Sequence, residues 1–279
     1  HCNNPRPHTL ALSREENGEV VAPAGVPYYR SIGSATVEKI IAVSEHTKRD
    51  VVRLLKTPEE KITVIHEGVN PQFHRINNEA LITEFREKMG LTKPYLLYTG
   101  VWRSHKNLVN LIKSFAILKK KHRFDGWLVI TGKEDPWYPE VKQTVRDEHL
   151  DGEVRFTGLI PDDDLVLLYN AALMYVLPSF YEGFGLPALE AFACGIPVCA
   201  ARSSSLPEVC GEGNAVFFDP HDPNDMAEKI ASVYNNPSRM EELRTRGLNR
   251  LKDFSWGKMA KETFALYNSY VHPHSKNPA

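Results

Sequence analysis

From Pro94 onward, short apolar runs that end in Gly or Pro alternate with longer segments of helical period. Such runs are typical of strands in a parallel sheet that is covered by helices on both faces. Six of them occur, at residues 95–100, 127–132, 154–158, 173–179, 196–201 and 215–219. The alternation predicts an α/β fold built on a doubly wound, Rossmann-like parallel sheet.

Helices are predicted between these strands, and the segments with helical period are residues 106–121, 137–149, 162–172 and 187–194. Three more helical segments begin near Pro223, Ser238 and Ser255, with no further strand among them. The acidic run at 162–164 follows a proline and precedes apolar residues, which indicates a helix start in preference to a metal site. The basic run at 119–123 indicates a helix end, and a contact with anionic lipid is the less favoured alternative.

A shorter α/β pattern precedes the sheet. Residues 39–45 and 61–68 are predicted as strands, and residues 46–56 between them as an amphipathic helix. Residues 70–93 are expected to form a connector with a helix of its own, while the first 30 residues show no clear period. Because two strands cannot cover both faces of a sheet, we expect most of this domain, ahead of Thr36, to be missing.

The composition excludes several classes of protein. A formal net charge of −1 over 279 residues argues against a general binder of polyanions such as nucleic acid. No apolar run reaches the roughly 18 residues of a membrane span, and the N-terminus does not resemble a signal peptide, so a cytoplasmic location is expected. The cysteines lack metal-ligand spacing and are predicted to be reduced structural thiols: Cys2, Cys194, Cys199 and Cys210.

The stretch "YEGFGLPALEAFACG" at 181–195 follows the fourth predicted strand. Pro187 suits the first position of a helix, and Gly195 suits the position just past its end. Gly183 and Gly185 let a ligand approach the backbone, and the unpaired N–H groups of the helix start attract negative charge. This pattern predicts an anion-binding site.

Two carboxylates flank that site. Glu182 precedes the loop, and Glu190 lies about one turn, roughly 5 Å, along the helix. Carboxylates only accept hydrogen bonds, so they suit a ligand with hydroxyls on each side of its phosphates, as in a sugar nucleotide. One alternative is a dinucleotide fingerprint in "GFGLPA" with Glu208 as its acid, which is disfavoured because that motif follows the first strand of its domain. Another is simple turn glycines, which would leave both glutamates on the surface.

A second polar stretch, "GVWRSHKNL", follows the first strand of the sheet at Gly100. It brings Arg103 and Lys106 to the start of a helix, where two cations can neutralise a phosphate together with backbone N–H groups. A solvated loop with surface charges is an equal alternative on spacing alone. His105, between the two cations, is expected to face solvent.

The order of these motifs resembles the C-terminal, donor-binding half of GT4-type, group 1 glycosyltransferases with the GT-B fold. The resemblance runs from about Thr36 to Tyr270 and is densest where "VRFTGLIPDDDL", "SFYEGFGLPALEAFACGIPV" and "SSLPEV" follow one another. It implies a remnant of an N-terminal, acceptor-side Rossmann-like domain at 1–75 and a linker at 76–93. A nucleotide-sugar-binding Rossmann-like domain at 94–255 and a C-terminal helix and tail at 256–279 would follow.

The resemblance implies transfer of a mannose- or glucose-type hexose from a donor such as GDP-mannose or UDP-glucose, with retention of configuration. No metal and no other cofactor would be obligatory. Two alternatives stay open: a nucleotide-sugar-binding module without its own transferase activity, and a GT-B-fold nucleotide-sugar epimerase. The implied partners are a nucleotide-diphosphate sugar and a saccharide or lipid-linked acceptor. A peripheral contact with the inner face of the membrane and a second chain completing the N-terminal domain stay open, and no nucleic acid is expected.

By the same resemblance, Glu182 would hold a hydroxyl of the donor hexose and Glu190 the ribose hydroxyls. Arg103 and Lys106 would stabilise the leaving diphosphate as its charge develops. With Glu182, these two cations form the expected catalytic group. The expected donor-binding group offers backbone N–H groups at 183–186 and a surface for the base near 157–160; it comprises Gly100, Thr157, Gly158, Ile160, Gly183, Phe184, Gly185, Leu186 and Glu190.

Overall fold

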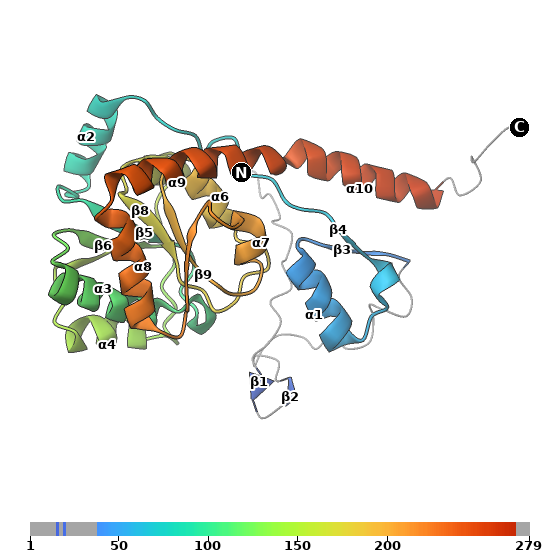
Figure 1. The fold of residues 1–279 in the computed structure, drawn as a ribbon, viewed down its shortest axis with the longest axis horizontal. Coiled ribbons are helices and arrows are strands. Elements are labelled where there is room, and N and C mark those ends of the chain that lie inside the picture. Colours follow the sequence, from blue (N-terminus) through green and yellow to red (C-terminus); the bar gives the residue numbers. More distant parts are fainter. Residues whose placement is uncertain (1–14, 17–18, 21–37, 272–279) are drawn as a thin grey trace, which may run out of the picture.

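The computed structural model describes residues 15–16, 19–20 and 38–271, and its largest feature is a six-stranded parallel sheet (Figure 1). Each predicted strand of the sheet is confirmed: β5 (Tyr95–Thr99), β6 (Trp127–Thr131), β7 (Val154–Gly158), β8 (Met174–Leu177), β9 (Val198–Ala201) and β10 (Val216–Phe218). Their order is β10-β9-β8-β5-β6-β7. The chain adds β6 and β7 on one side of β5 and then β8, β9 and β10 on its other side, so the switch point lies between β5 and β8. Ligands of doubly wound sheets bind beside such a switch point.

Strands β5, β6, β8 and β9 are buried along their whole length, because helices cover both faces of the sheet. On one face α3 packs against α4 and α8, and elsewhere α6 packs against α9 (Figure 1). The helices are α3 (Leu108–His122), α4 (Glu140–Asp147), α5 (Asp162–Asn170), α6 (Leu186–Ala193), α7 (Leu206–Cys210), α8 (Pro223–Tyr234) and α9 (Pro237–Arg250). The predicted doubly wound sheet is therefore confirmed.

Charged runs in the sheet domain lie at helix ends, as the sequence indicates. Residues 162–164 form the first turn of α5, directly after Pro161. The lysines at the end of α3 pair with glutamates on neighbouring elements: Lys119 with Glu153, Lys120 with Glu148 and Lys121 with Glu228. Because acids of the same domain balance this basic run, an anionic lipid is not needed to explain it.

Three of the cysteines are buried free thiols, as predicted: Cys194, Cys199 and Cys210. Burial raises the pKa of the Cys194 and Cys210 thiols to about 12, so they stay protonated and unreactive at neutral pH. Cys2 lies outside the described residues. Among the described helices, none is long and apolar enough to cross a membrane.

A small parallel βαβ unit precedes the sheet domain. It consists of β3 (Ile40–Ala42), α1 (Glu45–Leu55), the short 3-10 helix η1 (Glu59–Lys61) and β4 (Ile62–Val64), in agreement with the strands and helix expected there. Ala42, Val51 and Ile62 form its core. Two antiparallel strands of two residues each, β1 (Glu15–Glu16) and β2 (Glu19–Val20), precede it; they are too short to produce a period in the sequence.

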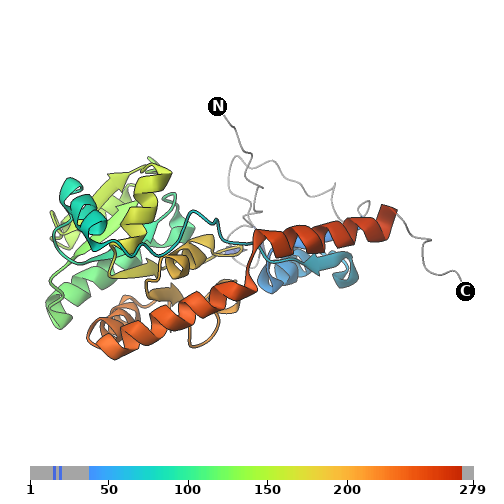
Figure 2. The same cartoon turned by 90° about the horizontal axis from the view of Figure 1, so that it is seen from above.

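Two segments run between the sheet domain and the βαβ unit, and the first of them is the covalent link. The first leaves β4 and leads through α2 (Glu79–Lys88), the helix expected in the connector, to β5. The second leaves α9 through the 3-10 helix η3 (Leu251–Asp253) and enters α10 (Trp256–Val271), which extends beyond the sheet domain on the side of the βαβ unit (Figure 2). The segments touch at Gly68, where a Cβ atom would lie 2.2 Å from the Trp256 nitrogen.

The loops that follow β5, β6 and β7 are tied together by glycines. The Gly100 nitrogen donates to the Thr131 carbonyl (3.2 Å), and the Gly132 nitrogen donates to the Gly158 carbonyl (2.9 Å). A Cβ atom on Gly132 would lie 2.0 Å from the Gly100 carbonyl oxygen, and Gly132 has φ of 119°. Only glycine permits this approach, so the loop that carries Gly100 can pack directly against the backbone of Gly132.

Replacing Gly132 tests this close approach. Gly132→Ala should lower the free energy of unfolding by about 3 kcal/mol or more, because a backbone atom must move to admit the methyl group. Gly152→Ala is the matched control, since Gly152 also has positive φ (78°) but a Cβ atom added there would have nothing within 4 Å. It should cost about 1 kcal/mol in urea unfolding, and equal losses in the two variants would contradict the packing argument.

Candidate functional site

The centre of the site is an ion pair between the loop after β5 and the loop after β8. Lys106, in the 3-10 helix η2 (Ser104–Lys106), places Nζ 2.7 and 2.8 Å from the two carboxylate oxygens of Glu182. The Ser179 hydroxyl donates to Oε1 of the same carboxylate (2.7 Å), and Glu182 is only 8% exposed. Lys106 therefore offsets the negative charge of the Glu182 carboxylate at this edge of the sheet.

Asn107 holds Lys106 in place, and the sequence analysis did not single it out. Asn107 is buried in the left-handed region (φ 60°), which asparagine tolerates better than most residues. Its Nδ2 donates to the carbonyls of Pro178 (2.9 Å) and Pro220 (2.8 Å). It thereby ties the loop after β5 to the loops after β8 and β10.

His105 differs from its expected position. We expected it to face solvent, but it is half-buried, and its carbonyl accepts a hydrogen bond from the Phe180 nitrogen (2.8 Å). Burial and then the neighbouring Lys106 charge lower the pKa of His105 below its ordinary value. The expectation was wrong because the main-chain bond to Phe180 draws this loop onto the loop after β8.

The glycine loop presents bare backbone, as predicted. Helix α6 begins at Leu186 with Gly185 as its N-cap residue (φ 109°) and a proline in its first turn. Within the described residues, no acceptor is recorded for the N–H groups of 183–186. A row of unpaired N–H groups at a helix start is an anion-binding geometry.

Serines from the loop after β9 form hydrogen bonds with the backbone of this glycine loop. The sequence analysis quoted them only within "SSLPEV" and assigned them no role. The Ser205 hydroxyl, fully buried, lies 2.8 Å from the Glu182 carbonyl and 2.9 Å from the Phe184 carbonyl. The Ser204 hydroxyl accepts a hydrogen bond from the Glu182 nitrogen (2.8 Å). With the carbonyls of Glu182 and Phe184 engaged by Ser205, the loop keeps a defined conformation despite its glycines.

Glu190 also lies inside the structure. It is half-buried on α6, and its Oε2 accepts a hydrogen bond from the Tyr169 hydroxyl (2.9 Å). Tyr169 in turn shares a hydrogen bond with the Thr99 hydroxyl (2.7 Å), and burial followed by the Glu190 charge raises the pKa of Tyr169 well above its usual range. Neither glutamate of the motif is a surface residue, which contradicts the alternative of simple turn glycines.

The remaining predicted residues lie at the same edge of the sheet. Arg103 is exposed before η2, and no ion pair is recorded for it among the described residues. Thr157 and Ile160 are half-buried and Gly158 is exposed at the end of β7, beyond β5 and β6. The structure thus brings Lys106 and Glu182 into contact and places residues 157–160 farther along the edge.

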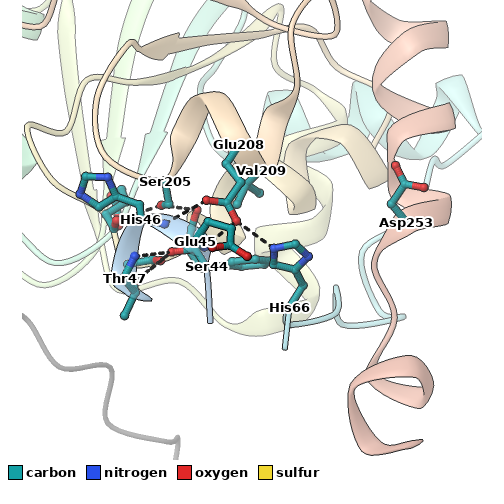
Figure 3. A network of polar contacts seen from close by, with 12 residues as sticks. Ser44, Glu45, His46, Thr47, His66, Ser205, Glu208, Val209 and Asp253 are labelled. Atoms are coloured by element: carbon teal, nitrogen blue, oxygen red, sulfur yellow. Dashed lines mark hydrogen bonds and ion pairs between the residues drawn. The ribbon is translucent and has the colours of Figure 1, made fainter. Parts of the chain in front are cut away.

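A second polar network joins the βαβ unit to the sheet domain (Figure 3). Glu208, on α7, accepts hydrogen bonds from the first backbone nitrogens of α1, at Glu45 (2.8 Å) and His46 (3.2 Å). Nε2 of His66 lies 2.9 Å from the same carboxylate. Glu208 therefore caps α1 from another part of the fold, and this role excludes it as the acidic residue of a dinucleotide fingerprint.

Residues 82–250 match the family described as Glycosyl transferases group 1, and residues 7–73 match Glycosyltransferase Family 4. The first match covers more than half of the chain and contains every predicted site residue, from Gly100 to Glu190. The chain belongs to the group 1 glycosyl transferases. This is a family of enzymes, and the resemblance to GT4-type proteins is confirmed.

Relatives and solved structures agree with this assignment. The chain is 32% identical to O-antigen chain mannosyltransferase B of Escherichia coli over 86% of its own length, and 27% identical to a D-inositol 3-phosphate glycosyltransferase of Corynebacterium kroppenstedtii over 95%. It spans 62% and 61% of those relatives, respectively.

Among structures, sucrose-phosphate synthase of Thermosynechococcus elongatus gives a TM-score of 0.71 at 26% identity, covering 84% of this chain and 58% of that one. Anabaena HepE, solved with UDP and glucose, gives a TM-score of 0.76 over 84% of this chain and 64% of that one. At 18% identity the HepE likeness concerns the fold alone. The predicted GT-B-type fold is confirmed.

A double-mutant cycle on Lys106→Ala and Glu182→Gln should give a coupling energy of about 1–3 kcal/mol, because removing either partner leaves the other partly buried and unpaired. Urea unfolding of the wild type, the two single variants and the double variant measures it. The same cycle on Lys93 and Asp125, an exposed pair, should give no measurable coupling. Equal coupling in both cycles would show that the Lys106 pair is an ordinary surface contact.

The Glu208 cap should make stability depend on pH. Desolvation alone would raise the pKa of Glu208, but hydrogen bonds from His66 and from the Glu45 and His46 nitrogens outweigh it and hold the pKa below the ordinary 4.5. A depressed folded-state pKa stabilises the fold above pH 4.5, and this stabilisation is lost as the pH falls through the folded value.

Glu208→Gln should therefore be less stable than the wild type near pH 6, and the difference should shrink as the pH falls from 5 toward 3. Thermal unfolding across this range checks the expectation. Glu84→Gln, at an exposed position of α2, is the control and should run parallel to the wild type. A constant difference between wild type and Glu208→Gln across the range would contradict the titration of this cap.

Proposed function

We propose that this chain holds the donor site of a hexosyltransferase that transfers a mannose- or glucose-type sugar from a nucleotide-diphosphate donor with retention of configuration. The observation that carries the proposal is the Lys106–Glu182 ion pair beside the N–H groups of 183–186, for which the described part of the chain provides no acceptor. This arrangement offers a cation and backbone donors for phosphates, next to a carboxylate for a sugar hydroxyl.

The chemistry follows from where charge develops. When the bond between the anomeric carbon and the diphosphate breaks, negative charge collects on the departing phosphate. Lys106, Arg103 and the N–H groups of the glycine loop would stabilise that charge without a metal ion, since fixed donors and cations can act as a metal would. We therefore propose that no metal is obligatory.

The other ends of the donor fit the remaining residues. Glu182 would accept a hydrogen bond from a hydroxyl of the hexose, and Glu190 would accept those of the ribose, about one helical turn away. The base would lie along residues 157–160, at the end of β7. In this orientation the diphosphate spans the start of α6, where the positive end of the helix dipole is favourable.

The relatives favour mannose as the transferred sugar, since four of them are named as mannosyltransferases of Escherichia coli. We therefore propose GDP-mannose as the first donor to test and UDP-glucose as the second. The chain spans less than two thirds of these relatives. A binding module that needs a further part for transfer is accordingly the second candidate, with an acceptor that is a saccharide or a lipid-linked sugar.

Binding and transfer are tested separately. Calorimetric titration with GDP, UDP, GDP-mannose and UDP-glucose measures donor binding, and product analysis with added saccharide acceptors, with and without EDTA, measures transfer and the configuration of the product. Binding without transfer would favour the module. An epimerised donor with no acceptor consumed would indicate an epimerase, and no binding to any nucleotide would contradict the proposal.

Site variants assign the parts of the donor to residues. Lys106→Ala should weaken nucleoside-diphosphate binding about tenfold or more and leave nucleoside binding unchanged, because a charged hydrogen bond to phosphate is lost. Lys113→Ala, on the exposed side of α3, is the control. Adding Glu182→Gln to Lys106→Ala should restore part of the loss by removing the unpaired carboxylate.

Glu190→Gln should weaken the binding of ribonucleotides but not that of their 2′,3′-dideoxy analogues, because only the ribonucleotides offer ribose hydroxyls to a carboxylate. The same calorimetric titration compares the two ligand series. Equal losses in both series would rule out the ribose assignment of Glu190.

A further inference from the structure

Two hydroxyls of the βαβ unit converge on one carbonyl of the glycine loop. The Ser44 hydroxyl lies 2.7 Å and the Thr47 hydroxyl 3.0 Å from the Gly183 carbonyl oxygen. A carbonyl oxygen has two lone pairs, so it can accept from both. Ser44 is fully buried, which makes this a specific contact inside the structure.

The start of α1 presents these hydroxyls in a fixed geometry. Ser44 is the N-cap residue, and its Oγ also accepts the hydrogen bond of the Thr47 nitrogen (3.0 Å). The Thr47 Oγ1 lies 3.0 Å from the same Ser44 Oγ, so the two side chains contact each other as well as the Gly183 carbonyl. The Glu208 carboxylate holds the same turn through the next two backbone nitrogens (Figure 3). The donors that hold the Gly183 carbonyl are therefore held in turn by the sheet domain.

Fixing this carbonyl also fixes a hydrogen-bond donor. The C=O of Gly183 and the N–H of Phe184 belong to one planar trans peptide and point in opposite directions. Since the carbonyl faces α1, the Phe184 N–H faces the other way, and no acceptor is recorded for it within the described residues. Glycines on both sides of Phe184 would otherwise let this peptide rotate easily.

We propose that Ser44 and Thr47 are positioning residues for the donor: by holding the Gly183 carbonyl they aim the Phe184 N–H at the bound sugar diphosphate. The inference rests on the proposed function, because it names a part of the same donor site. It assigns to the first turn of α1, which lies outside the sheet domain, the orientation of a backbone donor within that domain.

The test compares Thr47→Val, which removes the hydroxyl at nearly constant shape, with Thr47→Ser, which keeps it. Thr47→Val should weaken the binding of GDP-mannose and UDP-glucose about threefold to tenfold, the range expected for one hydrogen bond. The affinities for guanosine and uridine should not change. Thr47→Ser should bind within twofold of the wild type. Loss of nucleoside binding to the same extent would overturn the inference, and Thr47→Ala serves as a second variant where Thr47→Val does not fold.

Tyr181→Phe is the control for a simple tether. The Tyr181 hydroxyl also joins the loop to α1, through Asp50 (2.8 Å), but it does not touch the Gly183 carbonyl. Tyr181→Phe should bind nucleotide sugars as the wild type does. If Tyr181→Phe weakens nucleotide-sugar binding as much as Thr47→Val does, the Ser44 and Thr47 hydrogen bonds act only by holding α1 against the loop, and the positioning role is wrong.

A measurement without ligand separates this inference from the proposed function. In the free protein, Thr47→Val should shift the ¹H–¹⁵N resonance of the Phe184 amide, because the hydroxyl bonds to the carbonyl of the same peptide, whereas Thr47→Ser should leave the resonance unchanged. A Phe184 amide that does not respond to Thr47→Val overturns the positioning role. A wild type that binds no nucleotide sugar overturns the proposed function instead.

Discussion

In a parallel sheet every strand ends at the same edge, and each contact of the candidate site depends on that constraint. Lys106 follows β5 and Glu182 follows β8, yet they meet because these strands are neighbours at the switch point. Asn107 reaches carbonyls after β8 and β10 for the same reason. The topology thus determines which loops can exchange hydrogen bonds, and the side chains determine what the resulting edge can bind.

The fold could be predicted from the sequence because its signals are local. Buried strands, helix starts with acids or prolines and glycines at turns are each readable within a short window, and every strand of the large sheet lies where it was expected. The glycine-loop motif was equally local, since Glu182, the glycines and Glu190 lie within one stretch. Local pattern could also show that the loop would present bare backbone.

What connects these residues could not be predicted, because it joins segments far apart in the chain. The pairing of Lys106 with Glu182 explains how the predicted anion site could tolerate a carboxylate. This pairing depends on β5 and β8 being neighbours in the sheet, which the sequence alone does not show. Ser204, Ser205 and Asn107 bond to backbone atoms, so no sequence spacing marks them. His105 was misplaced because a main-chain bond to Phe180, from another loop, decides its burial.

The cap on α1 has a consequence for the order of folding. The backbone nitrogen of Glu45 and the carboxylate that accepts from it are 163 residues apart in sequence. At translation rates of about 5–20 residues per second, α1 and its local N-cap Ser44 leave the ribosome on the order of 10–30 s before Glu208 is synthesised. Among the described residues, the core that the βαβ unit forms by itself consists of Ala42, Val51 and Ile62. Early in synthesis, then, the first turn of α1 lacks the acceptor for two of its backbone N–H groups, and α7 supplies it later.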